Sequence, residues 1–369
     1  MRPFTDERHD EVRAAAVALA GSLAPDAPAR EIAAALARAE LLELAVPHAS
    51  DGAPTLSPLA IAVAREALAA DAPHADAILA VQALSSLPIA WGGSESTRAR
   101  WLPGLERGEE IGAFALTERA SGSDAAALEA TARRDGDGYR LDGEKVLVSG
   151  ARDATVLVVF ARTGDAGAKR AISAFAVPRD TRGLVVEDTP VLGGHAVATV
   201  RLDGARVPVG ARLGEEGEGL SLALRGLETM RPTVGAAACG VAARAIDEAR
   251  AVVCARRRGG EMLAEHEGVR LTLATLATEL DAARLLVYRA AWLRETTPPG
   301  TRLDAEAAMA KWYPTEACGR IVDAALQLHG GAGLAAGATI ERLYRHARAL
   351  RIYEGTTEIQ KLIIARAIL

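Results

Sequence analysis

The first third of the chain shows a helical spacing of apolar residues. Alanine and leucine recur three and four positions apart with charged residues between them, and such positions share one face of a helix. This spacing predicts helices over residues 10–22, 29–44, 57–70 and 75–90. A further short helix is expected between the capping run that starts at Ser94 and the glycine at 108. We therefore predict an N-terminal helical domain over residues 1–110.

The period of the pattern changes near residue 111. The dipeptides Asp135-Gly136, Asp137-Gly138 and Asp142-Gly143 are typical of hairpin turns. Alternating or β-branched runs occupy residues 138–141, 145–148, 155–161, 171–177, 184–187 and 198–202. Short runs with turns between them predict a compact antiparallel β-domain over residues 111–212, rather than alternating strand–helix–strand units.

Helical spacing returns after residue 212. The pattern predicts a long helix over residues 220–257, broken only around Arg231-Pro232, then helices over 263–294, 303–329 and 338–348 and a last one from about 356. Long helices joined by short loops predict a four-helix bundle over residues 213–369. The expected fold class is α+β multidomain, with N-terminal helices, a central antiparallel β-domain and a C-terminal four-helix bundle.

Composition narrows the possible functions. Half of the 369 residues are hydrophobic, which is enough for a sizeable core. The net charge of -5 argues against nucleic-acid binding, and no run of about 18 uncharged apolar residues predicts a membrane span. Cys239, Cys254 and Cys318 show neither C-x-x-C spacing nor a paired framework, which favours the reducing cytoplasm. The histidines are scattered, so we expect no metal site.

The strongest candidate chemistry lies between Arg351 and Gln360. The segment reads Arg-Ile-Tyr-Glu-Gly-Thr-Thr-Glu-Ile-Gln. Thr356 or Thr357 can cap the start of a helix, and Glu354 stands just before this start with apolar neighbours. A carboxylate in such surroundings can have a raised pKa and act as a base. A surface glutamate at a turn is the alternative interpretation.

Two distant segments together resemble the acyl-CoA dehydrogenase family. The segment 351–360 resembles its C-terminal signature, and A-F-A-L-T-E-R-A-S-G-S-D at 113–124 resembles its flavin-loop motif. The order of the two motifs, and of helical, β and helical parts, is also that of the family. The resemblance implies bound FAD, removal of an α-proton from an acyl thioester by Glu354, and transfer of a β-hydride to flavin N5. The redox chemistry then belongs to the cofactor, and fatty-acid metabolism is the expected setting.

The resemblance also implies binding residues. Positions that match family contacts to FAD are Thr117 (flavin ring), Ser123 (flavin phosphate or the CoA chain), Ser149 (beside flavin N5), Thr356 and Glu358 (ribose and diphosphate). Positions that match contacts to a neighbouring subunit's FAD are Arg256, Gln327, Gly330 and Gly331. Arg231 matches an arginine near the CoA phosphopantetheine, and Gly355 is the second substrate-binding candidate. Sites shared between subunits imply a homodimer or homotetramer.

A second base position exists in a minority of the family. It precedes the arginine matched by Arg231, and here it is Met230, which cannot accept a proton. Glu228 lies two residues away on a different helix face, so it is only a weak reserve for Glu354.

Several positions depart from the family pattern. Leu147 replaces a tryptophan that packs on the flavin, Gly259 replaces a phenylalanine, and His195 replaces the arginine of a glycine-x-arginine turn. The two lost aromatic surfaces suggest a divergent member with weaker FAD binding or a reshaped pocket.

These departures leave two alternatives to a dehydrogenase of acyl-CoA. One is the same chemistry on an acyl-carrier-protein thioester, which a basic row on one predicted helix could contact: Arg342, Arg345, Arg348 and Arg351. The other is a non-catalytic subunit in a mixed tetramer. The resemblance further implies an electron-transferring flavoprotein as the electron acceptor.

Overall fold

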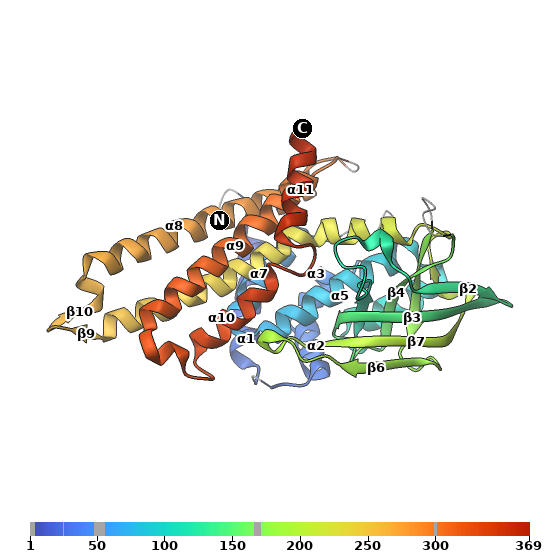
Figure 1. The fold of residues 1–369 in the computed structure, drawn as a ribbon, viewed down its shortest axis with the longest axis horizontal. Helices are drawn as coiled ribbons and strands as arrows, with labels where there is room; N and C mark the ends of the chain where they lie inside the picture. The colour runs from blue at the N-terminus through green and yellow to red at the C-terminus, as the bar shows by residue number, and fades with distance from the viewer. Residues whose placement is uncertain (1–3, 25, 48–55, 166–170, 299–300) are drawn as a thin grey trace.

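Helices and strands are segregated along the chain. The structure is a computed structural model that describes residues 4–24, 26–47, 56–165, 171–298 and 301–369. Figure 1 shows the β-domain at one end and the long C-terminal helices at the other, with the N-terminal helices packed between and behind them. The predicted fold class is confirmed in its order of helical, β and helical parts.

The N-terminal helices begin and end close to the predicted positions. They are α1 (Glu7–Ser22), α2 (Ala29–Arg38), α3 (Leu41–Ala45), α4 (Pro58–Asp71), α5 (Pro73–Gly92) and α6 (Glu95–Glu106). The single helix expected over 29–44 is wrong, because Glu40 adopts a left-handed φ of 58° that separates α2 from α3. Ser94 caps α6 by accepting the Thr97 N–H, as the sequence predicted.

Helix α5 is the central helix of the N-terminal part. It is long and apolar enough to cross a membrane by length and composition alone, with a mean hydropathy of 1.2 over 18 residues. However, 67% of that window is buried inside the protein, against α2, α4, α7 and strand β1 (Gly112–Ala115). This degree of burial is that of a core helix.

The β-domain contains a mixed sheet. Its further strands are β2 (Thr131–Asp135), β3 (Gly138–Ser149), β4 (Val156–Arg162), β5 (Ile172–Pro178), β6 (Leu184–Asp188), β7 (Val197–Pro208) and β8 (Arg212–Leu213). The order is β6-β7-β3-β2-β4-β5-β8, and β1 pairs with β4. The prediction of a purely antiparallel sheet is corrected at β4, because β1 runs parallel to it and β2 also pairs with it in parallel, at Thr131 and Arg162.

The C-terminal helices are α7 (Gly219–Ala255), α8 (Glu267–Thr296), α9 (Asp304–His329), α10 (Thr339–Leu350) and α11 (Thr357–Ile368). The expected break at Pro232 is wrong: α7 continues through it, because nearly every residue from 230 to 242 is buried against neighbouring helices. A hairpin, β9 (Arg257–Arg258) with β10 (Glu261–Met262), follows α7. Its two turn residues, Gly259 and Gly260, have φ of 61° and 92°, which explains glycine at position 259.

Glycine permits the close approach of α7 to its neighbours. A Cβ on Gly235 would collide with the backbone oxygen of Ala310 on α9, and a Cβ on Gly240 with that of Glu66 on α4. At Gly226, on the same helix, an added Cβ would be in ordinary contact with the side chains of Leu84 at 3.7 Å and Leu87 at 4.0 Å. The close packing of α7 against α9 and α4 therefore depends on glycine at positions 235 and 240.

Alanine substitutions in α7 test this packing. We expect Gly235→Ala and Gly240→Ala to lower the free energy of unfolding by about 1–3 kcal/mol or more, because backbone must move to admit the methyl group. The matched control Gly226→Ala should raise it by about 0.5–1 kcal/mol, since alanine favours helix without a clash. Thermal unfolding followed by circular dichroism measures all three. Equal effects at the three positions would contradict this account of the packing.

Candidate active site

Glu354 lies in the turn between α10 and α11. It is a non-glycine residue with a left-handed φ of 52°, and Gly355 follows with 94°. Its Oε2 atom is buried and has no hydrogen-bond partner among the described residues. Thr356 caps α11 by accepting the Ile359 N–H at 3.5 Å, as predicted. A strained residue with an unpaired carboxylate oxygen is an arrangement found at functional sites.

Buried side chains hold this turn in place. The Nζ atom of Lys311 on α9, which is fully buried, donates to the carbonyl of Gly355 at 2.7 Å. The amide of Gln360, also fully buried, donates to the carbonyls of Glu354 at 3.2 Å and Gly355 at 3.0 Å. These bonds satisfy the backbone of the turn without using the Glu354 carboxylate.

Two opposing effects act on the pKa of Glu354. Burial raises the pKa of Glu354, whereas the positive charges of Arg65, Lys311 and Arg231 lower it by smaller amounts. Burial likewise lowers the pKa of Lys311 to about 8, against the attraction of Glu354. The outcome is a carboxylate that is easier to protonate than usual but remains surrounded by cations, which suits a general base.

Arg231 and Arg65 differ in their hydrogen-bond partners. Arg231 is 8% exposed and its Nε atom has no partner in the described part of the chain. Arg65 on α4 is 1% exposed and donates to Asp76 on α5 at 2.7 and 3.1 Å and to Thr233 at 2.9 Å. Arg231 was predicted as a substrate contact, and its unpaired nitrogen leaves it available to a ligand.

Arg65, Asp76 and Lys311 were not among the residues predicted for the site. The sequence signal for Arg65 was that it and Glu66 interrupt the apolar run of residues 58–69, all of which are buried in the structure. A charged residue in such a run needs a buried partner. The identity of that partner depends on how α4, α5 and α7 pack, which no local pattern reveals.

The predicted flavin loop is anchored by a buried ion pair. The Lys145 Nζ atom, fully buried in β3, lies 2.7 Å from Glu118 Oε1. The carboxylate of Glu118 also accepts the N–H groups of Glu129 at 2.6 Å and Ala130 at 3.0 Å. Thr117 is joined to β3 through its carbonyl, which accepts the Val146 N–H at 2.9 Å. The pair therefore fixes the loop against the strand.

Strand β3 carries two further predicted positions. Ser149 ends the strand and lines a cavity of about 270 Å³. Leu147 has a left-handed φ of 56° at a bulge and is 52% exposed. Ser123 lies in the exposed part of the loop before β2. Glu358 is exposed at the start of α11, and hydrogen bonds to backbone and to Thr356 lower its pKa.

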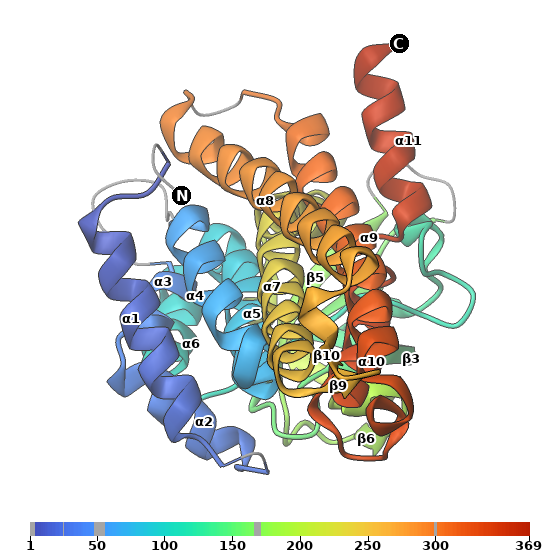
Figure 2. The same cartoon turned by 90° about the vertical axis from the view of Figure 1, so that its left-hand side faces the viewer.

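The residues predicted to contact a neighbouring subunit's FAD lie in a separate region of the chain. Arg256 donates to the carbonyl of His329 at 2.7 Å, next to Gly330, and Gly331 and Gln327 are exposed nearby on the chain. The hairpin β9–β10, which follows Arg256, stands at the end of the molecule away from the β-domain (Figure 1; Figure 2 views this end). The structure thus separates these four residues from Glu354, Thr117 and Ser149.

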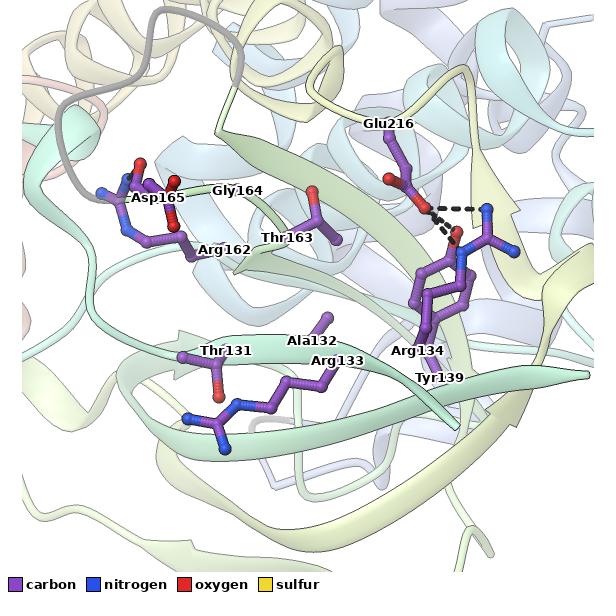
Figure 3. Close-up of a pocket in the computed structure, with 10 residues that line it drawn as sticks. All are labelled: Thr131, Ala132, Arg133, Arg134, Tyr139, Arg162, Thr163, Gly164, Asp165 and Glu216. Carbon is purple, nitrogen blue, oxygen red and sulfur yellow. Dashed lines mark hydrogen bonds and ion pairs between the residues drawn. The ribbon is translucent and has the colours of Figure 1, made fainter. Parts of the chain in front are cut away.

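A polar pocket on the surface of the β-domain contains none of the predicted site residues. It has a volume of about 440 Å³ and is lined by residues of β2, the start of β3, the end of β4 and the segment before α7. Figure 3 shows Arg134 and Tyr139 directed to Glu216 within it, at 2.9 and 2.5 Å. Its lining is mostly polar, and the carboxylate of Glu216 is already paired with Arg134. The buried carboxylate of Glu354, rather than this surface pocket, marks the candidate active site.

Comparison with known proteins identifies relatives over nearly the whole chain. Three family models match: acyl-CoA dehydrogenase N-terminal domain over residues 4–109, middle domain over 113–207 and C-terminal domain over 217–369. The chain is 38% identical over 329 residues to the mitochondrial short-chain specific acyl-CoA dehydrogenase of Homo sapiens, which corresponds to 88% of this chain and 79% of that protein.

Solved structures show the same fold. Glutaryl-CoA dehydrogenase of Mycobacterium smegmatis in complex with FADH2 matches with a TM-score of 0.89 and 25% identity over 99% of this chain and 95% of that one. A chain in a structure described as the electron transferring flavoprotein of Acidaminococcus fermentans matches with a TM-score of 0.93 and 27% identity over all of both chains.

Neutralising Glu118 tests the anchoring of the loop. We expect Glu118→Gln to lower the free energy of unfolding by about 3–5 kcal/mol, because Lys145 would be left buried without a counter-charge. The control Glu144→Gln removes only exposed pairs with Arg119 and Arg201, so it should change stability little. Denaturant unfolding of both variants gives the comparison. A loss no larger in Glu118→Gln than in Glu144→Gln would contradict the anchoring role.

Proposed function

Because this chain belongs to the acyl-CoA dehydrogenase family, we propose that it is an FAD-dependent dehydrogenase that removes the α-proton of an acyl-CoA thioester with Glu354. The observation that carries the assignment of the base is the buried, unpaired Oε2 atom of Glu354 with three cations around it. The prediction of an acyl-CoA dehydrogenase is confirmed by the family matches. The relatives do not favour the carrier-protein or non-catalytic alternatives.

The residues present fit FAD. Ser149 offers a hydroxyl at the rim of a cavity, and the exposed Leu147 beside it presents an apolar surface that a ring can cover. We propose that Thr117, Ser123, Ser149, Thr356 and Glu358 hold the cofactor bound to this chain. When bound, FAD supplies the acceptor for the two electrons of the oxidation. The M. smegmatis relative, solved with FADH2, supports this cofactor.

The chain's own residues perform the proton transfer and the positioning. Glu354 accepts the α-proton on its unpaired Oε2, and burial favours the protonated carboxyl that results. Lys311 and Gln360 hold the turn, so that the carboxylate keeps its direction as its charge changes. We propose that Arg231 and Gly355 bind the thioester, and the unpaired Nε of Arg231 supports a polar contact there.

The separate group around Arg256 supports a homo-oligomer. We propose that Arg256, Gln327, Gly330 and Gly331 contact FAD bound by a second copy, in a homodimer or homotetramer, since they lie away from Glu354 in their own subunit. Exposed apolar side chains on the C-terminal part, Leu271 at 62% and Leu334 at 72%, are suited to such an interface.

An electron-transferring flavoprotein is our proposed acceptor of the electrons. The similarity to a chain in the A. fermentans structure supports this partner. We further propose a cytoplasmic location and a role in fatty-acid metabolism. The three cysteines are free thiols, which suits a reducing compartment.

Replacing Glu354 tests the base. We expect Glu354→Gln to bind FAD normally but to reduce kcat by about 10²–10⁴-fold, since glutamine cannot accept the proton. Flavin bleaching by butanoyl-, hexanoyl- and octanoyl-CoA without oxygen measures the rate. The comparison variant Glu228→Gln, in which an ion pair with Arg294 is lost, should keep most of the activity. The reverse result would make Glu228 the base, and failure of the wild type to bind FAD would overturn the proposed function.

The pH dependence follows from the raised pKa of Glu354. The base works only when ionised, so kcat/KM should fall as the pH decreases through a pKa above the usual glutamate value. Lys311→Met removes a nearby positive charge, so this acid limb should move to higher pH. Lys361 is exposed on α11, so the control Lys361→Met should leave the acid limb at the same pH. An unmoved limb in Lys311→Met would show that Lys311 does not influence the base.

A further inference from the structure

A cavity beside the candidate active site is lined by three imidazoles. It has a volume of about 270 Å³ and lies between the end of β3, the first half of α5, the turn at 193–196 and α10. His74, His195 and His346 line it together with Asp26 and Asp153. An apolar strip of α5 completes the lining with Ala77, Ile78 and Val81.

Two of the imidazoles have unused hydrogen-bonding atoms. His195 and His346 stack with ring centroids 4.6 Å apart at an interplanar angle of 23°. The Nε2 atom of each is buried and lacks a partner within the described residues, and His346 is only 8% exposed. Two unsatisfied buried nitrogens are costly unless a ligand pairs with them.

The cavity is close to the proposed reaction centre. The ring of Tyr353, the residue before Glu354, lies edge-on to His195 with centroids 6.3 Å apart. Ser149, our proposed flavin contact, lines the same cavity. Tyr353 therefore links the turn that carries Glu354 to the stacked imidazoles.

We propose that His195 and His346 form a subsite for a neutral hydrogen-bonding group, such as a hydroxyl, on the far part of the acyl chain. The proposal rests on the proposed function and specifies its substrate class: acyl thioesters with a polar substituent rather than plain alkyl chains. The strip Ala77, Ile78 and Val81 suits the methylene groups of the chain, and the imidazoles suit its polar end.

Charge in the cavity selects against an anionic substituent. Burial lowers the pKa of His346 to about 3, with His195, His74 and Arg65 acting in the same direction. Burial also lowers the pKa of His195, so both rings are neutral near pH 7. The two carboxylates of the lining, Asp26 and Asp153, would repel a carboxylate on the substrate. A hydroxyl can donate to or accept from a neutral imidazole.

Chain-matched substrates test the subsite in the FAD-loaded enzyme. We compare kcat/KM for butanoyl- and hexanoyl-CoA with their ω-hydroxy counterparts. At the length that reaches the histidines, the hydroxy compound should be preferred by about threefold to tenfold, the contribution of one hydrogen bond. His195→Leu and His346→Leu should abolish the preference while the plain compound still reacts. His346→Asn, which keeps a hydrogen-bonding side chain, should retain part of it.

The control variant is His266→Leu. His266 also has a buried, unpaired Nε2 atom but lies outside the cavity, so the preference should be unchanged. Preference for the plain compound at both lengths, or a preference that survives both leucine variants, would overturn the subsite while leaving the dehydrogenase assignment intact. Failure of every compound to bleach the flavin would overturn the dehydrogenase assignment and the subsite with it.

Discussion

The candidate active site depends on burying a carboxylate together with positive charge. The Oε2 atom of Glu354 has no hydrogen-bond partner among the described residues, and burial raises the pKa of this carboxyl and so favours its protonated form. Arg65, Lys311 and Arg231 come from three different helices and oppose that effect. The C-terminal turn, the N-terminal helices and α7 must therefore all be in place before the carboxylate is both buried and basic.

The packing of the helices brings these positive charges close to Glu354. Helix α7 carries Arg231 and Thr233, and its glycines let α4 and α9 approach closely enough to bring Arg65 and Lys311 to the same region. Within the β-domain, the ion pair of Glu118 and Lys145 fixes the predicted flavin loop against β3. Close apolar packing between helices or strands therefore determines which charged groups meet. The residues next to each charged group in the sequence say little about its partner.

The periodic pattern predicted the order and most positions of the helices, because amphipathic spacing reflects burial directly. It failed where tertiary contacts decide: Pro232 lies inside an unbroken helix, and β1 and β2 pair in parallel with β4, a strand to which neither is joined by a hairpin. Glu354 could be identified from its motif, and the cap at Thr356 from local chemistry. Arg65 with Asp76, and His195 with His346, could not, since each pair is formed by elements that meet only in the folded chain.

The ion pair of Arg65 and Asp76 has a consequence for how such chains diverge. The two residues lie on consecutive helices, and Arg65 also bonds Thr233 on α7. Suppose that two related chains recombine between α4 and α5, and that only one of them has the pair. The product would then carry one charged residue of the pair without the other, and a lone charge would be buried. Inheritance of the two helices is thus linked, and the pair is expected to be gained or lost as a unit.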